Sequence, residues 1–353
     1  MIFDCLKGKK VLLTGNTGFK GSWMTLLLRK YGAVVYGYSI DCPTDPCLYE
    51  LLGLCDDMQT EMGDVADYDR LYSYFCDIEP DIVIHMAAQP IVRTGYKNPR
   101  ETYSSNVMGT VNILECIRNT DCTRSFLNVT TDKVYENLEC DKYYSEGDRL
   151  DGFDPYSNSK SCSELVTHCY ERSFFEKKNC SISTARAGNV IGGGDFADDR
   201  IVPDCVRAMI SKKKIIVRNP NSIRPYQHVL EPLFAYTMII CKQMNDRDYS
   251  GSYNVGPNRD DCLTTGELAT KFCNYWGDDA EWVSLSDNGP HEANYLKLDN
   301  TLLKETLGVS PMWTSDDAIS HTVSWTRKWL AGDDVRKITE EQIDEYLKQR
   351  QLA

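Results

Sequence analysis

Residues 9–21, Lys-Lys-Val-Leu-Leu-Thr-Gly-Asn-Thr-Gly-Phe-Lys-Gly, decide the fold class of this chain. A short apolar strand runs directly into three glycines that are spaced three residues apart. Gly15 permits a tight turn, Gly18 lets the backbone approach a pyrophosphate, and Gly21 allows a helix to pack closely on a sheet. The N–H groups and the dipole of the helix that begins there favour an anionic ligand. The segment therefore predicts a dinucleotide-binding turn.

Strand and helix patterns alternate through the first half of the chain. This alternation predicts a parallel sheet with helices on both faces, an α/β fold of the Rossmann-type doubly wound class. The expected strands are 10–14, 34–38, 81–86, 125–130 and 181–186, and the expected helices are 19–30, 67–77, 103–118 and 155–176.

The pattern loosens from about residue 195, which suggests a second lobe. We expect an NAD-binding Rossmann domain over 1–190, to which some later segments contribute strands. A smaller, interleaved substrate-binding lobe is expected over 191–353. Thr339 to Gln342 resembles a capping box and predicts that a C-terminal helix begins there.

Composition excludes several classes of protein. The net charge of −13 over 353 residues disfavours nucleic-acid binding. No apolar run reaches about 18 residues, so no membrane span is expected. The N-terminus lacks the apolar segment of a signal peptide, which predicts a cytoplasmic protein. The 15 cysteines are scattered without a Cys-x-x-Cys pair, so we expect reduced, mostly buried thiols and no metal site.

The segment after the second expected strand bears on which dinucleotide binds. Asp41 lies 20 residues beyond Gly21, where an acidic residue holds the adenosine ribose. No Lys or Arg occurs between Lys30 and Arg70, although a 2′-phosphate would need a basic partner. NAD is therefore predicted over NADP. Two alternatives remain open: Asp41 is only a turn residue, or Ser39 or Tyr38 contacts the ribose.

Tyr156 and Lys160 carry the predicted chemistry. They are four residues apart, so on a helix they share one face. An ammonium group near a phenol lowers the phenol's pKa and makes it a usable base for a hydroxyl proton. Thr131, at the end of an expected strand, is a second candidate contact to the substrate oxygen.

Asp132 and Lys133 follow Thr131 directly and offer an acid and a base beside that site. Simple alcohol oxidation needs neither of them. Elimination of water needs a group that removes a carbon-bound proton and an acid that protonates the leaving hydroxyl. The alternative interpretation is a charged pair on a loop.

Longer runs carry a resemblance to a known family. The chain resembles the extended short-chain dehydrogenase/reductase family and, within it, the CDP-glucose branch of the NAD-dependent sugar-nucleotide 4,6-dehydratases. The resemblance covers nearly the whole chain. The runs that carry it are 14–23, 85–90, 105–110, 131–133, 154–160, 186–195, 224–232 and 290–299.

The resemblance implies a lyase that retains NAD and dehydrates CDP-glucose, in the biosynthesis of deoxysugars and surface polysaccharides such as O-antigen. In this reaction C4 is oxidised while Tyr156 takes the O4 proton, water leaves across C5–C6, and hydride returns to C6. Asp132 is then the acid and Lys133 the base candidate, with the division of roles open. A homo-oligomer, either a dimer or a tetramer, is also implied.

The motifs and the resemblance together give the expected ligand contacts. Arg200 and Arg224 are the candidate cations for the substrate diphosphate, because guanidinium matches phosphate oxygens. Asn16 replaces a histidine that is usual in the family, which predicts a looser hold on NAD. The other expected substrate contacts are Gln89, Asn189, Tyr226, His228, His291 and Glu292. The expected cofactor contacts are Gly15, Thr17, Gly18, Phe19, Lys20, Gly21, Tyr38, Ser39, Asp41, Asp64, Val65, Met86, Ala87, Ala88, Asn106, Thr130, Tyr156 and Lys160.

Three alternatives to this function remain. A 4,6-dehydratase for another nucleotide sugar would share all these motifs. A 4-epimerase needs the Tyr156–Lys160 pair but no elimination couple, so Asp132 and Lys133 disfavour it. A non-catalytic NAD-binding regulator would have no need of Tyr156 or Lys160, and both are present.

Overall fold

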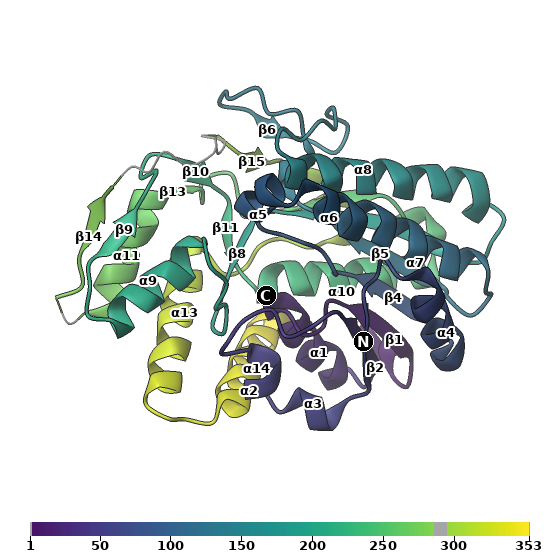
Figure 1. The fold of residues 1–353 in the computed structure, drawn as a ribbon, viewed down its shortest axis with the longest axis horizontal. Coiled ribbons are helices and arrows are strands. Elements are labelled where there is room, and N and C mark those ends of the chain that lie inside the picture. Colours follow the sequence, from purple (N-terminus) through teal and green to yellow (C-terminus); the bar gives the residue numbers. More distant parts are fainter. Residues whose placement is uncertain (1, 278, 286–294, 353) are drawn as a thin grey trace.

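A parallel sheet of seven strands forms the centre of the fold (Figure 1). The structure, a computed structural model, describes residues 2–277, 279–285 and 295–352. From one edge to the other, the strands are β12 (Ser252–Val255), β7 (Ser181–Ala187), β5 (Ser125–Val129), β4 (Ile82–His85), β1 (Lys10–Thr14), β2 (Val34–Ser39) and β3 (Thr60–Met62). The direction of strand order reverses at β1, which pairs with both β4 and β2. Such a reversal opens a crevice at the carboxyl ends of the strands.

Side chains alternate between the two faces of the sheet, as the strand period requires. Leu12, Val83 and Phe126 point to one face and Leu13, Ile84 and Leu127 to the other, and all six are fully buried. The first face is covered by α4 (Tyr68–Ile78), α7 (Gly109–Arg118) and α8 (Pro155–Tyr170), and the second by α1 (Phe19–Lys30), α10 (Leu230–Asn245) and α14 (Val335–Leu352). This arrangement confirms the predicted fold class.

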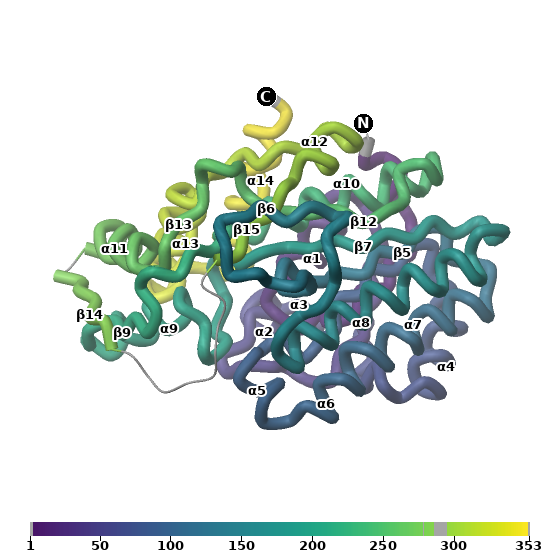
Figure 2. Tube along the Cα trace, turned by 90° about the horizontal axis from the view of Figure 1, so that it is seen from above, coloured from purple at the N-terminus to yellow at the C-terminus, as the bar shows by residue number. Residues whose placement is uncertain are grey.

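The second lobe projects to one side of this sheet (Figure 2). Val206, Leu268, Phe272 and Ile319 form part of its own buried core. Its main elements are α9 (Ile201–Ile210), β9 (Ile215–Val217), α11 (Thr265–Trp276), β14 (Trp282–Ser284) and α13 (Ser315–Leu330). The chain interleaves, because β12, α10 and α14 come from its later part but belong to the central layers.

Short elements connect these layers and frame the crevice. Three of the two-stranded sheets are β8 (Asn189–Ile191) with β11 (Tyr226–His228), β10 (Ile223–Arg224) with β13 (Leu263–Thr264), and β6 (Tyr143–Tyr144) with β15 (Lys297–Leu298). The remaining helices are α2 (Leu48–Leu51), α3 (Leu54–Asp57), α5 (Val92–Lys97), α6 (Pro99–Tyr103) and α12 (Thr301–Leu307), with the short turns η1 (Ile2–Leu6), η2 (Ser104–Met108), η3 (Asp132–Val134), η4 (Glu171–Phe175) and η5 (Arg247–Tyr249).

Most predicted elements are observed, and three expectations need correction. The helix predicted over 103–118 is divided, because the π-turn η2 separates α6 from α7. The C-terminal helix begins at Val335, and Thr339 lies inside it, where its hydroxyl donates to Val335 O and accepts from Trp325 Nε1.

The cysteines are free thiols, but only five of the fifteen are buried. Within the described ranges, no helix has the length and apolar character that a bilayer span requires.

Candidate active site

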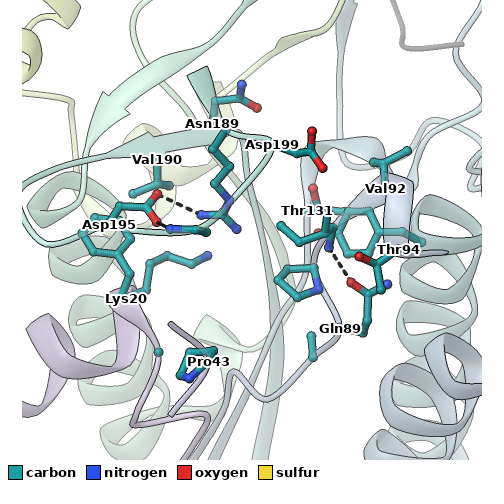
Figure 3. A pocket seen from close by; sticks show the side chains of 18 of the residues that line it. Lys20, Pro43, Gln89, Val92, Thr94, Thr131, Asn189, Val190, Asp195 and Asp199 are labelled. Carbon is teal, nitrogen blue, oxygen red and sulfur yellow. Dashed lines mark hydrogen bonds and ion pairs between the residues drawn. The ribbon is translucent and has the colours of Figure 1, made fainter. Parts of the chain in front are cut away.

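A cleft of about 1560 Å³ opens at the carboxyl ends of the strands, between the sheet and the second lobe. Lys20 and Asp195 lie on one wall, and Gln89, Val92 and Thr94 lie on the opposite wall (Figure 3). The glycine turn forms part of the same lining, together with the loops that follow β2, β4 and β5. The motifs singled out in the sequence thus meet in one cavity.

The glycine turn is built for close backbone approach. Gly15 has φ +74°, and a Cβ there would lie 2.8 Å from Ala87 N. A Cβ on Gly21 would lie 2.2 Å from Gly15 O, so only glycine lets α1 start this close to the turn. A long, flat anionic ligand can therefore lie directly against backbone here, at the N-terminus of α1.

The wall after β2 is formed by Ser39, Ile40 and Asp41. Thr17 Oγ1 donates to Asp41 O at 2.6 Å, which joins this wall to the glycine turn. Asn16 points away from the cleft: its Nδ2 donates to Thr60 at 3.0 Å and its Oδ1 accepts from Ser39 at 2.8 Å. The looser hold on NAD stays a prediction, but no direct contact from Asn16 supports it.

Two expected cofactor residues do not line the cleft. Tyr38 is fully buried, and its hydroxyl donates to Asp64 O at 3.2 Å on the far side of the strand. Asn106 is buried as well, accepting from Gln89 N at 2.8 Å and donating to Ser159 Oγ at 2.8 Å. Both residues support the wall rather than contact a ligand, so these two expectations are corrected. The remaining cofactor candidates all line the cavity.

Helix α8 presents Tyr156 and Lys160 to the cleft. Asp154 caps the helix by accepting from the N–H groups of Tyr156 and Ser157 at 3.0 and 3.1 Å, and Pro155 occupies the first helical position. Lys160 Nζ donates to Val129 O at 3.1 Å, which ties the helix to the end of β5.

Burial dominates the electrostatics of this pair. It raises the pKa of Tyr156 to about 12, against a hydrogen bond with Thr131 that lowers it. It lowers the pKa of Lys160 to about 8, against the negative charge of Glu164. The expected lowering of the Tyr156 pKa is thus wrong for the ligand-free protein, because loss of hydration outweighs the neighbouring charges.

Asp132 and Lys133 form the turn η3 at the end of β5. Asp132 Oδ1 accepts from Thr131 Oγ1 at 2.9 Å and lies 3.4 Å from Lys133 Nζ. Lys133 lines the cleft and also reaches Asn189 Oδ1 at 3.5 Å. The carboxylate of Asp132 is fully buried directly behind this lining, and its Oδ2 has no hydrogen-bond partner among the residues that the structure describes. The Asp132 carboxylate and the Lys133 ammonium group are therefore in direct contact with each other.

The second lobe brings cations to the cleft. Arg200 pairs with Asp195 at 3.2 Å, and Arg224 lines the same wall. Sequence reasoning missed Arg93 and Arg218, which pair with the same carboxylate oxygen of Asp199 at 3.6 and 2.9 Å. No spacing pattern relates positions 93 and 218, so only the folded chain reveals this cluster.

The other substrate candidates differ in their placement. Asn189 and Tyr226 line the cleft, as does Gln89, whose side-chain amide is already bonded to Thr102 and Ile91 N. His228 is corrected: it is fully buried beside Trp23 and Trp313, away from the cavity. His291 and Glu292 lie outside the described residues.

One cluster of potential metal ligands was not expected from the sequence. The donor atoms of Cys42, Cys47 and Glu50 lie within 4.8 Å of one another. Burial, followed by the neighbouring Cys47 and Glu50, raises the pKa of Cys42 to about 12.

Comparisons with known proteins agree with this geometry. A family model described as GDP-mannose 4,6-dehydratase matches residues 12–322. A CDP-glucose 4,6-dehydratase from Salmonella typhimurium is 43% identical over 347 residues, covering 97% of each chain. The solved dTDP-glucose 4,6-dehydratase from Streptomyces venezuelae, with NAD bound, aligns with a TM-score of 0.79 at 21% identity, covering 92% of this chain and 98% of that one. The UDP-glucose 4-epimerase from Thermotoga maritima aligns with a TM-score of 0.80 at 20% identity, covering 91% and 99%.

Proposed function

This chain belongs to the GDP-mannose 4,6-dehydratase family, and from that premise we propose that it converts CDP-glucose to CDP-4-dehydro-6-deoxyglucose and water. Full-length similarity to the Salmonella enzyme supports the choice of nucleotide. The observation that carries the chemistry is that Tyr156, Lys160, Thr131 and Lys133 line one cleft with the glycine turn.

NAD is the cofactor that this cleft fits. The backbone of Gly15 and Gly18 would hold the pyrophosphate, and Ser39 and Asp41 would hold the adenosine ribose, in a stretch of sequence that has no Lys or Arg between Lys30 and Arg70. When bound, NAD would supply the hydride acceptor for oxidation at C4 and the hydride donor for reduction at C6. The protein's own residues bind the sugar, move its protons and exclude water.

Tyr156 acts on the O4 hydroxyl in the first step. Thr131 contacts the same oxygen and orients it, while Lys160 holds positive charge beside the phenol. Because burial raises the pKa of the Tyr156 phenol, nearby positive charge is needed to make it a base, and the Lys160 ammonium group supplies it from the same helical face.

Lys133 and Asp132 act in the second step. Lys133 faces the cleft and removes the C5 proton, which the new C4 ketone has acidified. Asp132, which lies 3.4 Å from Lys133 Nζ, gives a proton to O6, which leaves as water. The C5 proton held by Lys133 returns to C5 when hydride reaches C6, and the O4 proton taken by Tyr156 replaces the one that Asp132 has lost.

The proposal also covers the domains that bind each ligand, the cellular location, the pathway and the assembly. We place the cofactor mainly on residues 1–190 and the sugar nucleotide mainly on 191–353, in a cytoplasmic enzyme of deoxysugar and surface-polysaccharide biosynthesis. A homo-oligomer is proposed, paired through α7 and α8. Leu165, Met108 and Phe174 support it, because each is about half exposed on or beside these helices. Light scattering tests this assembly, and a Leu165→Glu variant should release monomers.

Gly15→Ala should weaken NAD binding at least about tenfold. A methyl group at φ +74° is strained and meets Ala87 N at 2.8 Å, so the turn must open where the pyrophosphate lies. Titration of the variant with NAD measures the loss. Gly147→Ala is the matched control, since nothing lies within 4 Å of its Cβ. Equal NAD affinity in both variants would contradict the assigned turn.

Arg218→Gln should raise KM for CDP-glucose about tenfold and leave kcat within about twofold. The reason is that a guanidinium facing the diphosphate binds ground state and transition state alike. Arg149→Gln is the control, because Arg149 is exposed and pairs only with acidic side chains away from the cleft. A fall in kcat with unchanged KM would place Arg218 in the chemistry instead.

A panel of CDP-glucose, UDP-glucose, GDP-mannose and dTDP-glucose, each with and without added NAD, tests the nucleotide choice. Mass spectrometry should detect loss of one water from CDP-glucose alone. Dependence on added NAD would show that the cofactor is held loosely. Loss of water from a different nucleotide sugar, or from none, would overturn the proposal.

A further inference from the structure

Glu164 is a fully buried carboxylate that the proposed mechanism does not use. It lies on α8 at the same spacing that separates Tyr156 from Lys160, so the three residues form one stripe along the helix. Its side chain has no exposed surface, and it does not line the cleft. Burying a carboxylate destabilises the folded protein unless hydrogen bonds and an opposite charge compensate for the lost hydration, so Glu164 needs such partners.

Besides His168 on its own helix, Glu164 contacts β7 and the end of β5, the strand that leads into Thr131 and Asp132. Thr130 Oγ1, at the end of β5, donates to one carboxylate oxygen. Thr184 Oγ1 and Arg186 Nη2, both on β7, donate to the other oxygen at 2.7 and 2.9 Å. Thr130 immediately precedes Thr131, so Glu164 fixes the strand end on which Thr131 and Asp132 stand.

Arg186 keeps this carboxylate charged. Burial would raise the pKa of Glu164, but the Arg186 guanidinium and the hydroxyl donors hold it below its usual range. Arg186 is itself fixed by Tyr135 Oη and Glu146 O, each at 2.9 Å. A permanent negative charge therefore lies behind Lys160, one helical turn farther along α8.

We infer that Glu164 is a positioning residue that couples α8 to the end of β5 and holds Lys160 as an ammonium ion. The inference deepens the proposed function and rests on it. Glu164 contacts neither cofactor nor substrate, because it is separated from the cavity by Lys160 and Thr130. Loss of its charge should act on turnover only through the protonation of Lys160 and the placement of Thr131.

Among the charged and titratable groups near Lys160, Glu164 is the one whose charge raises the Lys160 pKa. The Lys160 charge contributes to lowering the pKa of Lys20 on α1 and of His85 on β4. Burial lowers the pKa of His85 to about 3, so His85 is neutral in the working range. Burial, then Arg200 and Lys160, lowers the pKa of Lys20 to about 7. Near Glu164 itself, Arg186, Tyr135 and His168 are the facing groups.

The test is the pH dependence of kcat for the wild type and for Glu164→Gln. Removing the carboxylate should lower the Lys160 pKa, so the fall of kcat on the alkaline side should begin at a lower pH in the variant than in the wild type. The ratio of wild-type to variant kcat should stay constant below about pH 6 and rise about tenfold by about pH 9. Lys20 titrates in both proteins, so its contribution cancels in the ratio. A ratio that does not change with pH would overturn the inference.

Three further variants separate charge from structure. Glu164→Asp keeps the charge, so its kcat should fall over the same alkaline pH range as that of the wild type, even if kcat itself is lower. Glu231→Gln is the matched control, a buried carboxylate paired with Arg350 at 2.7 Å outside the cleft lining, and its ratio should be flat. If Glu164→Gln fails to fold, Glu164→Gln/Arg186→Gln removes both charges together and should show the same shift.

A direct titration distinguishes this inference from the proposed function. In protein labelled with ¹³C-lysine, the Lys160 signal is the one lost in Lys160→Arg. Its midpoint should move to lower pH in the Glu164→Gln variant, whether or not the protein dehydrates any sugar. An unmoved midpoint overturns the inference alone, and absence of wild-type turnover overturns the proposed function alone.

Discussion

Tyr156→Phe should lower kcat by about 10²- to 10⁴-fold while NAD affinity stays within about twofold. The phenol is the group that takes the O4 proton, and general base catalysis contributes a factor of this size. Phenylalanine keeps the ring and its packing, because Tyr156 is almost fully buried on α8. Turnover assays with CDP-glucose and an NAD titration give both quantities.

Tyr253→Phe is the matched control for that prediction. Its hydroxyl donates to Tyr249 O at 2.6 Å on a buried strand, and it does not line the cleft. It should turn over at nearly the wild-type rate. If Tyr156→Phe also turns over normally, the phenol is not the base, and the first step needs another residue.

Asp132→Asn should lower the rate of water loss about 10²-fold or more while oxidation at C4 survives. An amide cannot give its proton to O6, but it keeps the shape of the buried side chain and can still accept from Thr131. We expect cofactor reduction, followed by absorbance, to reach a plateau without release of product. Asp81→Asn, a carboxylate paired with Lys9 away from the cleft, is the control.

Product formation at the normal rate in Asp132→Asn would assign the acid elsewhere. The buried position of Asp132 makes this a sharp test, because its carboxylate reaches the cleft only by way of Thr131 and Lys133. A loss of C4 oxidation as well would show that Asp132 supports Tyr156 rather than the elimination.

Local patterns were enough to predict the parts of the site that depend on spacing. The three glycines require a tight turn, and the four-residue interval places Tyr156 and Lys160 on one helical face wherever that helix packs. The apolar runs likewise predict strands of a parallel sheet, which β1, β4 and β5 form. The turn, the helical face and the strands are set by neighbours close in sequence, whereas the order of the strands in the sheet is not.

The errors concern features that depend on tertiary packing. His228 lies in a run that resembles a ligand-binding segment, but Trp23 and Trp313 enclose it from distant parts of the chain. Arg93 and Arg218 meet only because the second lobe folds over α5. The pKa of Tyr156 rises because burial is greater than a two-residue motif reveals.

In the proposed reaction, the hydride that leaves C4 returns to C6 of the same sugar, while Lys133 and Asp132 eliminate water. Incubation with CDP-glucose carrying deuterium at C4 tests this transfer most directly. We expect a product that has lost one water and carries the deuterium at C6, as mass spectrometry and NMR would show. A product of unchanged mass would identify an epimerase, and a dehydrated product without the deuterium would contradict the shared hydride.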